Sequence, residues 1–547
     1  MRAETGAARS GTVPIGSVPG VTVRGGTVTL WDLVQPHNGL VPDAAYGPEA
    51  VSSWNCAVLA LPRSLPVLWR DLRDAATTMP CPVRRGTHML APGFEERDRV
   101  IDGGSFGLAF LLHLASRVLA LPCPPDLIAS VAIDEMGRCS RVDGLAEKLE
   151  GIAELAPGVT RVLLAASQHE QLRGLKSGRL ELVPIRTAAQ ALELAFGDAL
   201  GARLAEAGSD DARRRELVDA FFRLALVGRG AAVDWSPVER GAAIALRDWP
   251  LAFDDRYRLR FAAGIAARHE RNAGEVALPG SAWLDSQPAP IRVAVLSHLV
   301  QQAADTGTPA VAEIEPFAAQ EVPTDLGSAF VPQLKLAGAL GRLWAVTGRA
   351  VEALELQQRV ARAFVAMFED AELSFQLSEW FRLAGALGDA DAFAGAEAVL
   401  ARLDTTGALT AAGKPYVELS RARARVLLGA LDRGVAERLD KLAADLAMPA
   451  HIRWSAHRWA VRAWRELGEK DRAAERLRYM LKSGASVPHA MRYLVLAGLD
   501  ADILEHRANA ADIKAGIERL RELDPGPVGH LEAAYTEPAD IIRFYPY

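Results

Sequence analysis

The 547 residues lack the short motifs that mark several large classes of enzyme. No Walker A phosphate loop, no Gly-x-Gly-x-x-Gly turn and no His-Glu-x-x-His pair occurs in the chain. These motifs hold nucleotide phosphates, dinucleotides and catalytic zinc, respectively. The sequence therefore carries no ATPase module of the P-loop type, and any action on polypeptides would proceed without ATP hydrolysis by this chain.

Cysteine is also scarce. The four cysteines, Cys56, Cys81, Cys123 and Cys139, all lie in the first 140 residues, and none belongs to a Cys-x-x-Cys pair. No histidine cluster stands beside them in the sequence. This pattern argues against a zinc site and a disulfide framework, and it is typical of the reducing cytoplasm. We expect no metal, no cofactor and a cytoplasmic location.

Long apolar runs and an excess of basic charge are missing as well. The most apolar stretch, residues 106–122, is interrupted by His113 and Arg117 and is short for a bilayer. Residues 1–20 lack the apolar segment of a signal peptide, and their composition predicts a flexible N-terminus. A formal net charge of −6 gives no general attraction to nucleic acid or to anionic membranes. Neither is expected as a partner.

The first part of the chain, residues 21–198, alternates strand-like and helix-like segments, which predicts an α+β domain. "GVTVRGGTVTLWDLV" shows β-branched alternation broken by Gly-Gly, a hairpin signal. The apolar stretch after Ser105 predicts a buried helix. Further strands are predicted over residues 55–62, 127–133, 160–166 and 180–185, and further helices over residues 144–155 and 187–196.

The second part is predicted to be all-α. A helical region is expected over residues 199–333, with loops between helical groups in its least regular segments, residues 277–292 and 313–330. Beyond it, over residues 334–547, we predict an α-solenoid of helical repeats, which covers about residues 335–485, and a C-terminal tail.

Regular spacing supports that solenoid. A helix–turn–helix plan recurs four times, and its turn glycines, Gly348, Gly388, Gly429 and Gly468, are spaced by 40, 41 and 39 residues. Such helical pairs must stack on one another to bury their apolar faces. The segment "LGRLWAVTGRAVEALE" resembles a tetratricopeptide repeat, with a somewhat longer period than in that family.

Two segments of the α+β part resemble the proteolytic domain of Lon-type proteases. "DGGSFGLAF", residues 102–110, resembles the nucleophile motif, in which Asp-Gly-x-Ser-x-Gly precedes a buried helix. "VDGLAEKL", residues 142–149, resembles the Gly-Leu-x-x-Lys segment that carries the catalytic lysine. The resemblance implies Ser105 as the nucleophile and Lys148 as its base, with Asp102 in an orienting or structural role.

Elementary chemistry is consistent with this pair. A serine hydroxyl needs a neighbouring base, and a lysine is a base at neutral pH only where burial lowers its pKa. Lys148 shares its predicted helix with Leu145, Leu149 and Ile152, so a half-buried position is expected. At the start of the other helix, free amides suit an oxyanion, and Gly104 would let a substrate backbone approach closely.

Asp134 is the main departure from the Lon pattern. It stands where that family has a threonine whose hydroxyl contacts the lysine, in a hairpin about three residues shorter than usual. A carboxylate beside Lys148 would raise the lysine pKa and oppose general-base action. Alternatively, the short hairpin shifts the register and Asp134 points elsewhere.

Simpler interpretations apply to single residues. Ser105 can be a plain helix cap, and Lys148 a solvated lysine. A structural role is expected for His88, and a satisfied core position for His113. One further cluster of tryptophans and arginines has two interpretations. Either its tryptophans pack between the repeats and its arginines lie on the solvent-exposed face, or the cluster binds peptide or nucleic acid. It comprises Trp454, Trp459, Trp464, Arg453, Arg458, Arg462 and Arg465.

The sequence thus predicts an ATP-independent serine endopeptidase with a Ser-Lys dyad, whose repeats bind a protein or peptide substrate or a regulator. The fusion of such a domain to repeats suggests an effector in signalling or defence. One alternative is a Lon-like scaffold without useful turnover. Another is a repeat protein that senses a ligand and keeps its protease latent. The oligomeric state, including a ring, stays open.

Overall fold

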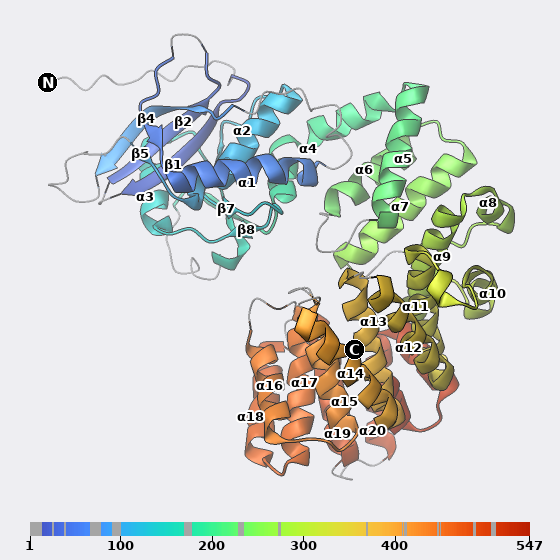
Figure 1. Cartoon of the computed structure of the whole chain (residues 1–547). Helices are drawn as coiled ribbons and strands as arrows, with labels where there is room; N and C mark the ends of the chain where they lie inside the picture. The colour runs from blue at the N-terminus through green and yellow to red at the C-terminus, as the bar shows by residue number, and fades with distance from the viewer. Residues whose placement is uncertain are drawn as a thin grey trace, which may run out of the picture. The chain divides into compact units, whose positions relative to one another are not determined.

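The computed structural model forms two compact units, residues 1–274 and 275–547 (Figure 1). The structure describes residues 14–24, 27–37, 40–65, 78–89, 100–168, 178–227, 235–271, 275–367, 370–406, 409, 413–445, 448, 450–484, 488–504 and 510–546. Of the N-terminus predicted to be flexible, residues 1–13 lie outside this part, and Val18–Gly20 belong to the first strand. The domain limits at residues 198 and 333 stay predictions.

The first unit begins with an antiparallel sheet in the order β1–β2–β4, formed by Val18–Arg24, Thr27–Val34 and Cys81–Met89. The pairing of β1 with β2 confirms the predicted hairpin. Alternate residues of these strands enter two different cores. Val18 packs with the helices over residues 48–64 and 107–119, whereas Val21 packs with the helix that carries Lys148.

A second sheet is parallel, in the order β10–β9–β6. Its strands are Leu127–Ala129 (β6), Arg161–Ala165 (β9) and Glu181–Ile185 (β10), within the predicted segments. Two short pairs complete the unit: β3 (Ala45–Tyr46) with β5 (Val100–Ile101), and β7 (Ala132–Ile133) with β8 (Cys139–Ser140). Parallel strands separated by helical segments are typical of a mixed α/β region.

One predicted strand, residues 55–62, is wrong, because it lies inside helix α1, Pro48–Ser64. A short apolar run fits a buried strand or a helix equally well, and only the surroundings decide. Here Ala50, Trp54, Ala57 and Leu61 are buried at helical spacing. Pro48 stands in the first turn, where its missing amide costs nothing.

The other predicted helices of this part are confirmed. Helix α2 (Gly107–Leu119) is buried on almost every face, and α3 (Leu145–Leu155) and α4 (Ala188–Ala207) follow. The unit ends with α5 (Asp211–Val227), α6 (Ser236–Asp248) and α7 (Phe253–Arg271).

The second unit is all-α and repetitive. Its predicted pairs are α11 with α12 (Val331–Val346, Ala350–Met367), α13 with α14 (Asp370–Leu387, Ala390–Thr406), α15 with α16 (Lys414–Leu427, Arg433–Ala444) and α17 with α18 (Ala450–Glu466, Lys470–Gly484). All four turn glycines have positive φ, between 69° and 90°. Glycine adopts that conformation without strain, which explains why it marks every turn.

The first helices of the pairs form a row. Helix α9 (Ala289–Thr306) packs on α11, α11 on α13, α13 on α15, α15 on α17, and α17 on α19 (Pro488–Leu504). Helices α20 (Ala510–Leu523), α21 (Pro525–Ala534) and α22 (Pro538–Phe544) complete the unit. We call this row the inner row, because α21 and α22 pack against its helices.

The loops predicted in residues 277–292 and 313–330 are wrong in part. Helix α8 (Ser281–Ser286), the start of α9, and most of α10 (Val311–Glu321) lie within them. Helix α8 is too short to show a period, and Pro316 interrupts the pattern of α10, which hid both helices from sequence analysis.

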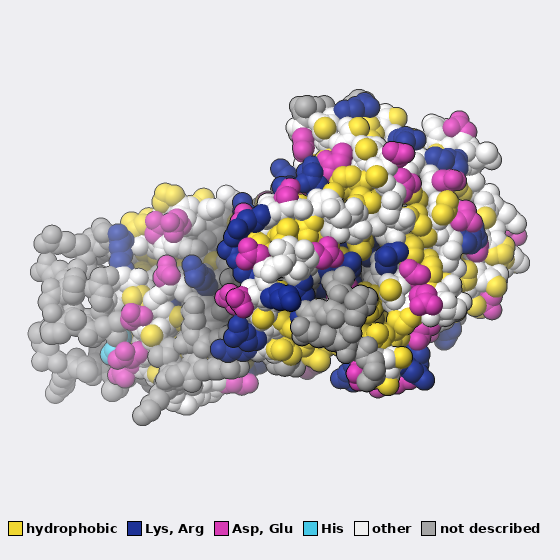
Figure 2. Space-filling view, turned by 90° about the horizontal axis from the view of Figure 1, so that it is seen from below, with side chains coloured by type: hydrophobic (Ala, Val, Ile, Leu, Met, Phe, Trp, Pro, Cys, Tyr) yellow, Lys and Arg dark blue, Asp and Glu magenta, His cyan; other side chains and the backbone are white. Residues whose placement is uncertain are grey.

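The fold class is therefore confirmed: a mixed α/β region is followed by an all-α region. All four cysteines are free thiols. Among the described helices, none combines the length and the apolar character needed to cross a membrane. On the face seen in Figure 2, Lys and Arg side chains are interspersed with Asp and Glu side chains.

Candidate active site

Ser105 lies in a one-turn 3-10 helix, Gly104–Phe106, directly before α2. The chain enters this turn through Gly103 at φ 106° and ψ 155°, a conformation open essentially to glycine alone. Phe106 is buried and anchors the turn, and the Ser105 side chain is half-buried. The serine is thus held at the entrance of a buried helix.

Asp102 has a structural partner. One of its carboxylate oxygens accepts hydrogen bonds from the backbone amides of Glu49, at 2.9 Å, and Ala50, at 3.3 Å. These amides belong to the first turn of α1, so Asp102 caps that helix across the chain. A side chain at Gly47 would collide with the carboxyl group, since a Cβ there would lie 2.4 Å from Asp102 Cγ. The cap ties the serine turn to α1.

The segment after β6 holds the other side of the serine turn. The Val131 amide donates to the Ser105 carbonyl, and the Leu108 amide donates to the Val131 carbonyl. Space here is tight: a Cβ on Gly104 would lie 3.3 Å from Ala132 Cβ, and one on Gly107 would lie 3.0 Å from the Ile133 nitrogen. Small residues at these two positions therefore let the turn approach β7 closely.

Lys148 is buried in the second turn of α3, with 4% of its surface exposed. Its neighbours in the core include Leu145, Leu149 and Ile152, as the predicted apolar face requires. Burial lowers the pKa of Lys148 to about 8, against the opposing charges of Asp143 and Glu147. A lysine in this environment is partly neutral near physiological pH, which a general base needs.

Strand β1 contacts the surroundings of both residues. A Cβ on Gly20 would lie 2.3 Å from the Phe106 ring, next to Ser105, and Val23 contacts Gly144 at the start of α3. However, neither Ser105 Oγ nor Lys148 Nζ makes a hydrogen bond within the described part of the chain. Strand β1 therefore packs against both the serine turn and α3, and no hydrogen bond joins the two side chains in the described part of the chain.

Asp134 organises the hairpin between β7 and β8. Its Oδ1 accepts from the amides of Met136 and Arg138, both at 2.9 Å, and its Oδ2 accepts from Arg138 Nε at 2.7 Å. Among the described residues it forms no ion pair with Lys148. Of the two alternatives for this residue, the geometry fits the one in which the carboxylate points elsewhere.

Two polar residues near the site were missed by sequence analysis. Ser130 is fully buried at the end of β6, and its hydroxyl has no hydrogen-bond partner in the described structure. Gln168, also buried, donates to the Val142 carbonyl at 2.6 Å and accepts from the Val142 amide at 3.0 Å, which ties the approach to α3 to the end of β9. For Ser130 the available signal was a polar residue directly after an apolar strand.

Two histidines, His113 and His88, are predicted to have structural positions. His113 is buried, and its Nδ1 lies 2.5 Å from the Gly16 carbonyl, but its Nε2 has no partner in the described part. Burial lowers its pKa to about 4. The prediction of a satisfied core histidine is therefore only half met. His88 lies opposite Val28 in the pairing of β4 with β2.

The tryptophan and arginine cluster belongs to the core of the repeats. Trp454, Trp459 and Trp464 are buried in the packing of α17. Arg458 is fully buried as well, so the predicted position of this arginine on the solvent-exposed face is wrong.

No family model matches the chain. A comparison with curated proteins finds a "Putative Lon protease homolog" of Haemophilus influenzae, with 29% identity over 116 residues. The chain is similar to a Lon relative. The match covers 19% of this chain and 19% of the relative, so the two share less than a fifth of either length.

Proposed function

We propose that the first unit is an ATP-independent serine peptidase with Ser105 as nucleophile and Lys148 as general base. The observation that carries the proposal is the buried lysine, whose pKa is lowered to about 8 and which has no ion-pair partner in the described part of the chain. A purely structural lysine gains nothing from such a position, because burial of an unpaired ammonium is unfavourable. The partial similarity to a Lon protease homolog supports the same assignment.

The proposed reaction is amide hydrolysis in two steps. Neutral Lys148 takes the hydroxyl proton as Ser105 Oγ bonds to the substrate carbonyl carbon, and the negative charge moves to the carbonyl oxygen. Collapse of this intermediate breaks the C–N bond, and Lys148 returns the proton to the leaving amine. Water then cleaves the ester by the same route, which regenerates the serine.

The serine turn supplies the remaining requirements. Backbone amides of the serine turn itself are suited to the oxyanion, whereas the first two amides of α2 already donate to the carbonyls of Gly104 and Val131. Gly104 lets the serine turn pack closely on Ala132, and the Asp102 cap on α1 holds the turn in place. Asp102 and Gly104 are therefore positioning residues in this proposal, and Asp134 shapes the neighbouring hairpin.

Covalent labelling tests the proposal. Wild type, Ser105→Ala and Lys148→Met are treated with a fluorophosphonate, and intact mass counts the adducts, with Ser140→Ala as the matched serine control. We expect one adduct on wild type and on Ser140→Ala and none on the other two. Equal labelling of wild type and Ser105→Ala would refute the nucleophile, and equal labelling of wild type and Lys148→Met would refute the base.

One observation favours a second candidate, a scaffold without turnover. No hydrogen bond joins Ser105 Oγ to Lys148 Nζ in the described structure. Such bonds often tighten only when substrate binds, so the apo geometry is compatible with both candidates. A folded wild-type protein that takes up no fluorophosphonate at pH 9, where Lys148 is mostly neutral, would favour the scaffold.

For the second unit we propose recruitment of a protein substrate or regulator. Stacked helical pairs create extended surfaces that suit binding of polypeptides. In this proposal the inner row of helices is the surface that faces such a ligand.

A further inference from the structure

One arginine recurs at the same place in every repeat. Arg342, Arg382, Arg423 and Arg462 each stand six residues before a turn glycine. They lie on α11, α13, α15 and α17, the inner row of helices. Repeated residues in equal positions on stacked helices form a column along the solenoid. We call these four residues the arginine column.

The chain's own C-terminal segment lies against this inner row. Helix α21 packs on α9 and α11, and α22 packs on α13, α19 and α20. His530 Nε2 lies 2.8 Å from the Ala303 carbonyl, and a Cβ on Gly526 would lie 2.4 Å from the Asp305 carbonyl oxygen. Residues 525–546 thus occupy the inner groove of the unit.

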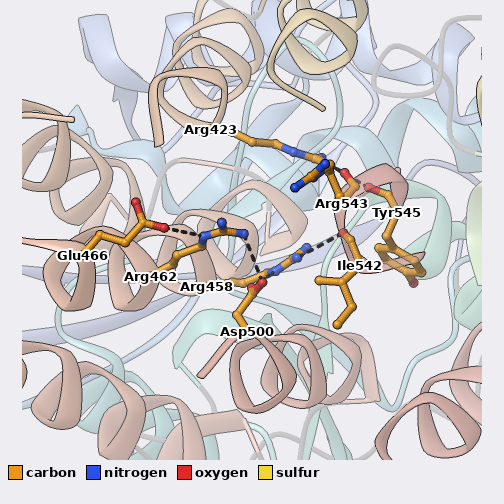
Figure 3. Close-up of polar contacts among 8 residues, drawn as sticks. All are labelled: Arg423, Arg458, Arg462, Glu466, Asp500, Ile542, Arg543 and Tyr545. Atoms are coloured by element: carbon orange, nitrogen blue, oxygen red, sulfur yellow. Dashed lines mark hydrogen bonds and ion pairs between the residues drawn. The ribbon is translucent and has the colours of Figure 1, made fainter. Parts of the chain in front are cut away.

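Arginines from three successive inner helices hold the end of α22, and Figure 3 shows two of them, Arg423 and Arg458. Arg423 donates to the carbonyls of Arg543, at 2.8 Å, and Tyr545, at 2.9 Å. Arg382 donates to the Phe544 carbonyl at 3.4 Å. Arg458, one turn before Arg462 on α17, donates to the Ile542 carbonyl at 3.5 Å. The last carbonyls of a helix lack partners within it, and cations stabilise that end.

Apolar side chains anchor the same helix. Ile541, Ile542, Phe544 and Tyr545 are all buried, and Phe544 stacks on Tyr535 with ring centroids 4.7 Å apart. The Tyr545 hydroxyl also donates to Asp524. A helix of seven residues is not stable by itself, so α22 depends on the groove for its structure.

The arginines around the groove differ in whether they pair with a carboxylate. Arg382 pairs with Glu379 at 2.6 Å. Arg458 pairs with Asp500 at 2.9 Å, and Arg462 pairs with both Glu466 and Asp500 (Figure 3). Arg423 has no carboxylate in hydrogen-bond contact among the described residues, and its Nε is buried without a partner. Main-chain carbonyls of the C-terminal segment are its acceptors. Arg342 pairs with Asp305 at 2.9 Å, so Arg423 is the member of the column that depends on an occupant with acceptor groups.

We propose that the groove of the arginine column is a peptide-binding site, that residues 538–546 occupy it in cis, and that a partner polypeptide displaces them. The partner segment is a short helix with paired aliphatic and then paired aromatic side chains, whose last carbonyls meet Arg382, Arg423 and Arg458. This inference rests on the recruiting role proposed for the repeats, but it does not depend on hydrolysis at Ser105.

Binding in trans tests the proposal on the full chain, with Ser105→Ala in every protein so that hydrolysis plays no part. The probe is a fluorescent peptide with the sequence of residues 537–546, EPADIIRFYP. Chains with Phe544→Ala and Tyr545→Ala carry a weakened cis occupant. We expect their affinity for the probe, measured by fluorescence anisotropy, to be about tenfold higher than that of the intact chain.

Groove variants complete the experiment. Adding Arg423→Met to the weakened chain should lower its affinity about tenfold, since two charge-assisted hydrogen bonds are lost. Arg425→Met is the matched control on the same helix, because Arg425 pairs with Asp432 and should not affect the probe. Equal binding by intact and weakened chains, or equal losses from Arg423→Met and Arg425→Met, would overturn the proposal.

Hydrogen exchange on the chain with an unaltered C-terminal segment guards against misfolded variants. Excess probe peptide should speed exchange of the amides of residues 540–546, because displaced residues lose their helix. Unchanged exchange at saturating peptide would refute displacement. Dimers that form by exchange of this segment between two copies would refute its occupation in cis. Since labelling of Ser105 is a separate measurement, either proposal can fail without the other.

Discussion

At the scale of single residues, the candidate site depends on Lys148. Its burial among apolar side chains lowers the pKa to about 8, while the nearby carboxylates Asp143 and Glu147 act in the opposite direction. Asp134, for which the sequence left a position beside the lysine open, instead accepts hydrogen bonds from Arg138 and from hairpin amides. The lysine therefore owes its pKa to desolvation above all.

The rate of labelling at Ser105 should follow the neutral fraction of Lys148. We expect the rate to rise about tenfold for each pH unit below the lysine pKa and to level off above about 8. Stopped labelling reactions between pH 6 and pH 9.5, read by intact mass, give the profile. A rate that does not change over this range would exclude Lys148 as the base.

The same burial predicts an effect on stability. The pKa of Lys148 is lower in the folded chain, at about 8, than the ordinary value of 10.5, so the unfolded chain binds more protons between these values. Stability should therefore rise with pH from about 8 to about 10.5. At pH 7, Lys148→Met should stabilise the first unit by about 3 kcal/mol, an upper figure from that pKa difference. This advantage should shrink toward pH 10.5 in urea titrations.

At the scale of elements, the serine turn and the repeat turns are both set by backbone conformation. Gly103 has φ 106° before Ser105, and the four repeat turns have glycines with positive φ. The start of α1 is completed by Asp102 from a distant part of the sequence. Local backbone conformation thus sets the serine turn and the repeat turns, whereas a long-range cap sets the start of α1.

Removal of the Asp102 cap should affect the fold and the site together. Asp102→Ala leaves two amides of α1 without their partner, at a cost of about 1 kcal/mol. Because the cap ties the serine turn to α1, labelling of Ser105 should slow as well. Asp102→Asn can still accept from these amides, so it should retain most of the stability and most of the labelling rate. Stability is measured by urea titration and labelling by intact mass. Equal losses of stability and of labelling rate in the two variants would contradict a capping role.

Gly388 tests the repeat turns without interference from packing. Its φ is 72°, and nothing lies within 4 Å of a Cβ added there. Gly388→Ala should cost about 1 kcal/mol through backbone strain alone. Gly388→Asn should cost less, because asparagine tolerates this conformation, and thermal unfolding compares the two. An alanine variant as stable as wild type would rule out a requirement for glycine at this turn.

At the scale of the whole molecule, the chain forms two compact units with separate cores. The cores differ in kind. The first unit packs helices on sheets, whereas the second packs helix pairs in a row and closes its inner groove with its own C-terminal segment. Units of this kind unfold separately unless a large apolar interface joins them.

Calorimetry should therefore resolve two unfolding transitions. Asp102→Ala should lower the midpoint of one transition only, and Gly388→Ala should lower the midpoint of the other only, since these residues lie in different units. A single transition that both variants shift equally would show that the two units unfold as one.

The sequence alone determined the features that depend on local pattern. A regular spacing of turn glycines predicted the helical pairs, because positive φ favours glycine at each turn. Runs of β-branched and apolar residues predicted β1, β2, β9 and β10. The helix over residues 55–62 was not predicted, because a short apolar run has no period of its own. Burial and the Asp102 cap decide that these residues are helical.

Tertiary structure decided what depends on distant partners. Only the packing of α3 shows that Lys148 is buried, and only the hairpin shows where the Asp134 carboxylate points. The arginine column is visible in the sequence once the repeats are aligned, but its acceptors on α22 lie 120 and 122 residues beyond Arg423. Burial and hydrogen bonding are properties of surroundings, and the chain creates those surroundings only by folding.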